Sequence, residues 1–335
     1  MTNEIGMAQH AKYAIPDYRH GYCVDDNCRA LMLYGMANIL YPSRYDHLID
    51  RYLAFICYMQ REDGQFRNFL SFDHQFLDEN GTEDAFGRTI WSLGSLMKNE
   101  PQPHAQQLAK EMLDKAFPHI ATLRSLRAMA YSLTGLVALW HSGRYDKDLV
   151  PTIQMLADTI CKEYAWNATT GWYWYESIIT YDNAILPYSL FLAFDLLKDE
   201  RCYAYASESA LFLDRVLYGD GDVLHLVGNA GWYPKGGTKA VFGQQAIEIP
   251  SLILMYSQLA KYGAETAFDR RAENSFMWFH GNNYLGAELF DPDTRGCRDG
   301  IDEFTVNQNQ GAESCICYWQ AFLYHFHQLD GVGSS

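Results

Sequence analysis

Positive charge is scarce in this sequence. Its 335 residues include 26 Lys and Arg against 41 Asp and Glu, which gives a formal net charge of −15. A chain with this balance is a poor partner for a nucleic-acid backbone or an anionic membrane surface. Charged residues make up 20% of the chain, below the roughly 25% usual for soluble proteins, and hydrophobic residues make up 48%. The composition therefore excludes a disordered protein and predicts a large packed core.

Signals for membrane insertion and for secretion are also missing. No stretch without Asp, Glu, Lys or Arg reaches the roughly 18 residues of a membrane span, and the longest, Ser314–Leu329, contains two His and two Gln. The first residues have neither the basic segment nor the apolar segment of a signal peptide, which favours the cytoplasm. The eight cysteines include no C-x-x-C pair, so we expect them to be reduced and buried as small hydrophobic residues.

Motifs for metals, phosphates and activated serines are absent too. The sequence has no P-loop, no G-x-G-x-x-G and no G-x-S-x-G. His325 and His327 are two positions apart on an expected helix, so they point to different faces and form no metal pair. We therefore expect no metal and no cofactor.

What the sequence does contain is a repeated helical format. Six uncharged stretches, each preceded by a polar cluster, recur at intervals of roughly 40 to 70 residues. They are Ala30–Leu40, Thr89–Met97, Ala128–Trp140, Ala184–Phe194, Ile249–Leu259 and Ser314–Phe326. Between them lie five stretches with a single apolar stripe, namely Asp46–Gln60, 104–116, 153–164, Arg201–Leu217 and Glu265–Phe279. A helix that is apolar all round must be buried, whereas a helix with one stripe covers something else.

This alternation predicts an all-α protein in which an outer ring of helices covers an inner ring, an (α/α)6 toroid. We expect residues 1–335 to form one domain, with residues 1–18 as an irregular segment in which Ala8–Ala14 forms at most a short turn. Four loops between outer and inner helices combine Gly with aromatic residues: 61–66, 167–174, 219–237 and 291–296. We expect short β-hairpins there, on the rim where the inner helices begin, and we expect the functional site on that rim.

Acidic and amide side chains gather at the expected starts of the inner helices. Helix capping explains one such residue at a helix start but not adjacent pairs such as Asp25-Asp26 and Glu83-Asp84. Glycoside cleavage requires carboxyl groups that donate and accept protons. We predict the catalytic carboxyl groups to be Asp25, Asp26, Asp182 and Glu313.

Two pairings of these acids are open. Asp26 and Asp182 lie three repeats apart in a six-repeat ring, so we expect their carboxyl groups within about 10 Å, the spacing of an inverting mechanism. Asp302 with Glu313 is the alternative, and the spacing does not decide between them.

The remaining polar and aromatic residues of the same rim are predicted to bind the substrate. They are Glu83, Asp84, Arg127, Asn183, Trp172, Trp174, Gln244, Gln245, Glu248, Asp302 and Asn309. The polar groups would hold sugar hydroxyls, and the two tryptophans would stack on sugar rings. The net charge favours a neutral glycan, although one of the two arginines near the third inner helix, Arg124 or Arg127, leaves a uronide substrate open.

Three segments, Gly21–Leu31, Phe242–Glu248 and Asn309–Ser314, resemble a bacterial group of (α/α)6 proteins, some of which occur joined to or labelled as glycosyltransferases. That group is similar to the six-hairpin glycosidase superfamily. The resemblance implies the toroid fold and carbohydrate chemistry. An α-mannanase type within the superfamily uses an adjacent Asp-Asp pair as its acid/base and nucleophile, and Asp25-Asp26 resembles that pair. Sugar 2-epimerases of the same fold work through histidines. None of the eleven histidines of this sequence falls at an inner-helix start.

The function predicted is a glycoside hydrolase, or an allied oligosaccharide-processing enzyme, acting on a neutral glycan by carboxylate acid–base catalysis. Two alternatives are a sugar isomerase or epimerase, and a non-catalytic glycan-binding or glycosyltransferase accessory subunit. We expect a carbohydrate as the partner, with no nucleic acid and no membrane. The oligomeric state is left open.

Overall fold

The computed structural model describes residues 1–99, 101–219, 221–263 and 266–329 and is predominantly helical. The chain divides into two compact units, Met1–Leu156 and Ala157–Gln328, which are described in turn. That the whole chain forms one domain stays a prediction. Among the described residues, every helix is too short or too polar to cross a membrane.

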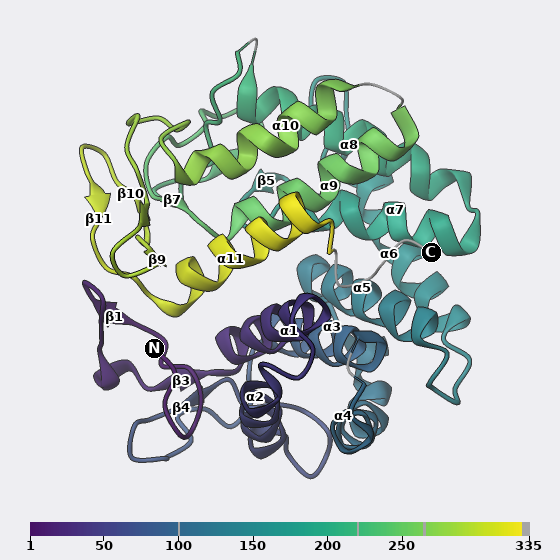
Figure 1. The fold of residues 1–335 in the computed structure, drawn as a ribbon. Coiled ribbons are helices and arrows are strands. Elements are labelled where there is room, and N and C mark those ends of the chain that lie inside the picture. Colours follow the sequence, from purple (N-terminus) through teal and green to yellow (C-terminus); the bar gives the residue numbers. More distant parts are fainter. Residues whose placement is uncertain (100, 220, 264–265, 330–335) are drawn as a thin grey trace. The chain divides into compact units, whose positions relative to one another are not determined.

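The first unit is built from five helices. They are α1 (Val24–Leu40), α2 (Asp46–Met59), α3 (Glu83–Asn99), α4 (Pro103–Ala116) and α5 (Leu126–Ser142). Helix α3 packs between α1 and α5, while α2 and α4 pack on α1 and α3 (Figure 1). As expected for inner and outer helices, α3 and α5 are buried on nearly all sides, whereas α4 buries one stripe from Ala105 to Ala116.

Glycines bring α3 and α5 into backbone contact. A Cβ atom on Gly94 would lie 2.1 Å from the carbonyl oxygen of Gly135, and a Cβ on Gly135 would lie 2.4 Å from the carbonyl oxygen of Ile90. Real side chains do not tolerate such distances, so both positions require glycine. The close approach also brings the first turns of the two helices together.

The N-terminal segment differs from the sequence expectation. Instead of a short turn at Ala8–Ala14, the strands β1 (Ala11–Lys12) and β2 (Ile15–Pro16) form an antiparallel hairpin, followed by the 3-10 turn η1 (Tyr18–His20). An antiparallel β-bridge from Ala8 to Tyr22 connects this segment to strand β3 (Tyr22–Cys23). Strand β3 in turn pairs with β4 (Phe69–Leu70).

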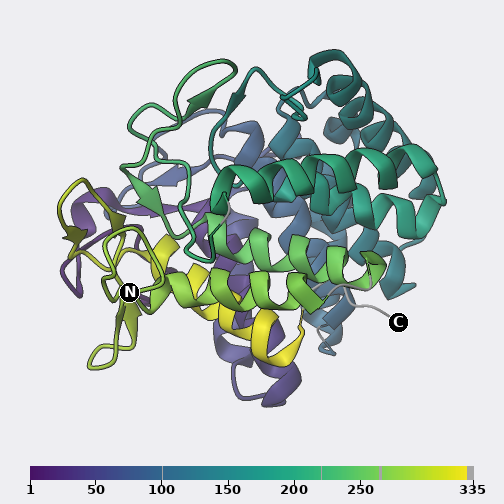
Figure 2. The same ribbon diagram turned by 90° about the horizontal axis from the view of Figure 1, so that it is seen from above.

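The second unit contains the remaining helices. They are α6 (Val150–Asn167), whose first residues belong to the other unit, α7 (Ile185–Leu197), α8 (Glu200–Tyr218), α9 (Glu248–Gly263), α10 (Thr266–Phe276) with the 3-10 turn η3 (Met277–Phe279), and α11 (Ala312–His327). Helix α9 packs against α7, α10 and α11. Figures 1 and 2 both show α9, α10 and α11 lying side by side.

Short strands occupy the loops of this unit. Strand β7 (Gln244–Gln245) pairs with β10 (Gly300–Ile301), which also pairs with β11 (Val306–Asn307). Two further antiparallel pairs are β5 (Ile178–Ile179) with β6 (Tyr233–Pro234), and β8 (Phe290–Asp291) with β9 (Gly296–Cys297). The last pair confirms the hairpin expected at 291–296. Loop 219–237 contributes β6, and its residue 220 lies outside the described residues.

The other two predicted hairpins are reduced to single bridges, from Gln60 to Phe66 and from Thr169 to Trp172. The eleven expected helices are all present among the described residues, although residues 264 and 265 of the stretch Glu265–Phe279 lie outside them. Helices α1 and α3 begin earlier than the uncharged stretches, because Asp25, Asp26, Glu83 and Asp84 form their first turns. Acidic side chains stabilise a helix in that position.

Candidate functional site

Two clusters of buried polar side chains stand at helix starts, one in each unit. In the first unit each carboxylate of the Asp25-Asp26 pair has an arginine partner. Arg88 Nε donates to Asp25 Oδ1 at 3.0 Å, and Arg29 Nη1 donates to Asp26 Oδ1 at 3.0 Å. The side chains of Asp26 and Arg29 are each only 5% exposed, so this ion pair is shielded from water. Such pairing compensates the charges that burial would otherwise make costly.

Arg88 extends the first cluster from α1 to α5. Its Nη2 donates to the Tyr131 hydroxyl at 2.8 Å, and its guanidinium carbon lies 4.2 Å from the centre of the Tyr131 ring. Trp91 also stacks on Tyr131, with the centres of the two rings 5.9 Å apart. Arg88 therefore joins the acidic pair of α1 to an aromatic group on α5.

Glu83 and Asp84 hold the start of α5. Glu83 Oε2 accepts from the backbone N–H groups of Arg124 and Ser125 at 2.7 and 2.6 Å. Asp84 Oδ1 accepts from the hydroxyl of Ser125 at 2.6 Å, and Ser125 is itself the N-cap of α5. These contacts fix the first turn of α5, in which Arg127 is buried.

The second unit contains a buried carboxyl pair at the starts of α7 and α9. Asp182 precedes α7 in a turn with φ of 43°, and Glu248 is the first residue of α9. Glu248 Oε1 accepts from the backbone N–H of Asp182 at 2.6 Å, and its Oε2 accepts from the backbone N–H and the side-chain amide of Asn183 at 3.3 and 3.2 Å. One carboxyl group thus holds the whole turn that carries Asp182.

The protonation of Glu248 is unusual. Burial raises its pKa to about 8 and the negative charge of Asp182 adds to the rise, while the hydrogen bonds from Asn183 and Asp182 act in the opposite direction. A carboxyl group with this pKa keeps its proton at neutral pH. Asp182 is buried beside it, so the site combines a protonated carboxyl group with a second acidic side chain.

The other site residues predicted in this unit differ in how deeply they are buried. Gln244 is buried, with its Oε1 accepting from Trp278 Nε1 at 3.1 Å, while Gln245, Asn309 and Glu313 are half-buried. Asp302 is exposed in the turn between β10 and β11. The structure therefore brings Asp182, Asn183 and Glu248 into direct contact and leaves Asp302 at the surface.

The two predicted stacking tryptophans are enclosed by protein. Trp174 is fully buried, and Trp172 is 4% exposed with its indole N–H bonded to the Glu176 carbonyl at 2.8 Å. Neither ring presents a face to a sugar. The pairing of Asp26 with Asp182 joins residues of different units and stays a prediction.

Sequence reasoning missed Arg29, Arg88 and Asp299. Arg29 lies three residues after Asp26 on one helix, a spacing that could have identified it. Asp299 accepts from the Gly311 backbone N–H at 2.7 Å and from the Ser314 hydroxyl at 2.5 Å, which fixes the start of α11. Within the described residues, no group of three or more His, Cys, Asp and Glu side chains could hold a metal ion.

Comparison with known proteins shows which fold this is. No protein-family model matches the chain, and no curated protein sequence matches it. Solved structures do. A cellobiose 2-epimerase from Spirochaeta thermophila DSM 6192 is 11% identical with a TM-score of 0.74, covering 98% of this chain and 92% of that chain. A D-mannose isomerase is 12% identical with a TM-score of 0.72, covering 98% and 93%.

A third similar structure is a GH76 α-mannanase from Bacteroides thetaiotaomicron, 11% identical with a TM-score of 0.64, covering 92% of this chain and 87% of that chain. These are (α/α)6 toroid enzymes. The predicted fold class, and the resemblance to the six-hairpin glycosidase superfamily at the level of the fold, are therefore confirmed.

Proposed function

We propose that this chain is a carbohydrate-processing enzyme, a glycoside hydrolase or a close ally, that uses buried carboxyl groups for acid–base chemistry on a neutral glycan. One observation carries the proposal: Asp182 and Glu248 are buried together at two helix starts, with the pKa of Glu248 raised to about 8. Glycoside cleavage needs a carboxyl group that is still protonated at neutral pH, and burial beside a second carboxyl group is a way to obtain one.

We assign the contact with substrate to Asp182 and a positioning role to Glu248. The proton of Glu248 passes by way of Asp182 to the glycosidic oxygen as the bond from that oxygen to the anomeric carbon breaks. A second carboxylate takes a proton from the water that attacks the anomeric carbon. Glu313, which lies in the same unit as Asp182, is the candidate for that second role, and catalytic roles for Asp25 and Asp26 stay predictions from the sequence. Asn183, Gln245 and Asn309 are the proposed contacts to sugar hydroxyls.

The charges support a neutral substrate. The net charge of −15 repels anionic chains. In the first cluster, Arg29 and Arg88 are already paired with Asp26 and Asp25. Arg127, which is buried in the first turn of α5, keeps the role predicted from the sequence, contact with a carboxylate if the substrate is a uronide.

Sugar epimerisation or isomerisation is the second candidate function. It is favoured by the solved structures with TM-scores of 0.70 to 0.74, which are epimerases and an isomerase. Against it, histidine is absent from the buried polar side chains of the described residues, whereas Asp26, Asp182 and Glu248 are among them. This set of groups fits carboxylate chemistry better.

The test is to incubate the full-length protein with neutral gluco-, manno- and galacto-oligosaccharides and to follow the products by NMR. New reducing ends support hydrolysis. Conversion of a free sugar without cleavage would establish the epimerase or isomerase instead. Binding without any conversion, unaffected by Asp182→Asn and Glu248→Gln, would establish a non-catalytic subunit.

A further inference from the structure

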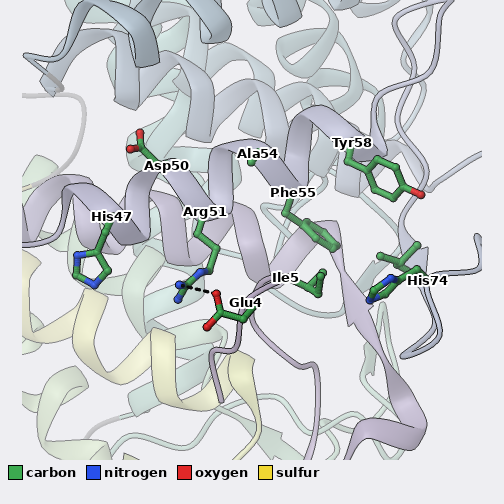
Figure 3. Close-up of a pocket in the computed structure, with 10 residues that line it drawn as sticks. Glu4, Ile5, His47, Asp50, Arg51, Ala54, Phe55, Tyr58 and His74 are labelled. Atoms are coloured by element: carbon green, nitrogen blue, oxygen red, sulfur yellow. Dashed lines mark ion pairs between the residues drawn. The ribbon is translucent and has the colours of Figure 1, made fainter.

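A hollow of about 640 Å³ lies on the first unit beside α2. His47, Arg51, Phe55 and Tyr58 line it and follow one another on α2 at intervals of four, four and three residues. Residues with these spacings share one face of a helix. Figure 3 shows His47, Arg51 and Phe55 projecting from the same side of α2, with Glu4, Ile5 and His74 around the hollow.

The floor of the hollow is apolar and one end is aromatic. Phe55 and Leu70 are 3% and 1% exposed, so they form a closed base. At the end of the stripe the Tyr58 ring stacks on Phe76 with ring centres 5.1 Å apart, and Arg67 lies over Phe76 with its guanidinium carbon 4.2 Å from the ring centre. Although its ring stacks on Phe76, Tyr58 is 54% exposed, so part of this side chain is accessible to a ligand.

Three charged residues of the hollow have partners, while other polar side chains that line it are available. Glu4 Oε2 lies 3.7 Å from Arg51 Nη2, and Asp50 Oδ1 lies 3.0 Å from His104 Nε2. In the part of the chain that the structure describes, the side chains of His47 and His74 and the hydroxyl of Tyr58 make no hydrogen bond. The hollow therefore offers hydrogen-bonding groups that have no partner of their own within the described residues.

We propose that this hollow is a second, non-catalytic binding site for a neutral oligosaccharide. Its volume falls in the range of roughly 300 to 1,000 Å³ that is usual for ligand sites. The stripe from His47 to Tyr58 extends over about 16 Å of helix, which suits a chain of several sugar rings better than a single ring. The Tyr58 ring would pack against the apolar face of one sugar, and the imidazoles would bond hydroxyls.

Other ligand classes fit less well. An amphipathic peptide helix needs a continuous apolar stripe, which His47 and Arg51 interrupt. A polyanion is opposed by the net charge. The choice of a carbohydrate rests on the proposed function, but none of the residues of the hollow takes part in that function.

The test is calorimetric titration of the full chain with cellohexaose, mannohexaose and, as an anionic probe, hexagalacturonate. Asp182→Asn serves as the background, so that the probe is not consumed. We compare Tyr58→Ala and His47→Ala with Tyr41→Ala, a matched control whose ring is 53% exposed but does not line the hollow. Turnover of a disaccharide is measured in the same three variants with Asp182 intact.

We expect a neutral hexasaccharide to bind at least about tenfold more weakly to Tyr58→Ala and His47→Ala, with Tyr41→Ala unchanged. Disaccharide turnover should be equal in all three variants. Equal affinities in all variants, or no binding of a neutral hexasaccharide, would overturn the proposal, as would tighter binding of hexagalacturonate. Tyr58-dependent binding in a protein that turns over no sugar would support this site while refuting the proposed function.

Discussion

Asp182 and Glu248 form the most informative contact of the second unit. Asp182 has a left-handed backbone, with φ of 43°, which Asp and Asn adopt several times more often than most other residues. Glu248 holds this turn by accepting from two consecutive backbone N–H groups. Strained turns that are fixed by buried neighbours concentrate at functional sites, so the geometry and the shifted pKa point to the same pair.

Replacing Asp182 by Asn tests its chemical role. Asn accepts the left-handed backbone, so we expect the fold and its thermal stability to persist, while turnover of the best oligosaccharide falls by at least about 10²-fold. Asp148→Asn is the matched control, because Asp148 is an exposed residue that bonds the Val150 backbone N–H at the start of α6. That variant should keep its rate. Turnover near that of the wild type in Asp182→Asn would move the acid–base role to Glu313 with Asp25 and Asp26.

Replacing Glu248 by Gln tests the shifted pKa. The pKa of Glu248 rises from 4.5 to about 8 on folding, so the folded state binds the proton more tightly than the unfolded state. The free energy of unfolding should therefore be highest below the unfolded pKa and fall by a few kcal/mol as the pH rises through about 8. In Glu248→Gln this part of the pH dependence should vanish. Urea unfolding at several pH values measures it, and parallel profiles for the two proteins would contradict the assignment.

The sequence predicted which residues cluster at helix starts but not how they pair. Arg88 contacts Asp25 across 63 residues, and Glu248 contacts Asp182 across 66. No local sequence pattern indicates which residues so far apart in the chain will contact each other. The burial of Trp172 and Trp174 could not be predicted either, because the sequence shows that a loop contains aromatic residues but not whether other residues cover their rings.

At the scale of elements the sequence was more informative. Helices such as α5 and α9 were predictable because an uncharged stretch of more than ten residues must be buried on every side. The β1–β2 hairpin was not, because each strand has two residues and no alternation can be read from so short a segment. The backbone contact between α3 and α5 was also missed, because in the sequence Gly94 and Gly135 appear only as residues of low helix propensity.

A glycine comparison tests that contact. Gly94→Ala places a methyl group 2.1 Å from the Gly135 carbonyl oxygen, so we expect the free energy of unfolding to fall by about 1 to 3 kcal/mol or more. Gly35→Ala in α1 is the control, because its Cβ would meet nothing within 4 Å. That change should stabilise by up to about 1 kcal/mol through helix propensity alone. Denaturant unfolding of both variants measures the difference, and equal effects would show that α3 and α5 separate readily.

At the scale of the whole molecule, net charge governs the approach of substrate. A charge of −15 should slow anionic chains at low salt and leave neutral chains unaffected. We therefore expect kcat/KM for a uronate-containing oligosaccharide to increase as ionic strength rises from about 0.01 M to about 0.15 M, where screening shortens from roughly 30 Å to roughly 8 Å. The value for a neutral oligosaccharide should stay constant. A decrease for the uronate would indicate a direct cationic contact, for which Arg127 is the candidate.

The left-handed turn at Asp182 also bears on how a family of such proteins can diverge. The residues that keep this backbone most easily are Asp, Asn and Gly. Asn and Gly lack a carboxylate, so the substitutions of Asp182 that the turn tolerates best are also those that remove its acidic group. A homologue with Asn or Gly at this position would be expected to fold normally while lacking this acid. The identity of this one residue therefore offers a criterion for separating active members of a gene family from descendants that retain the scaffold for binding alone.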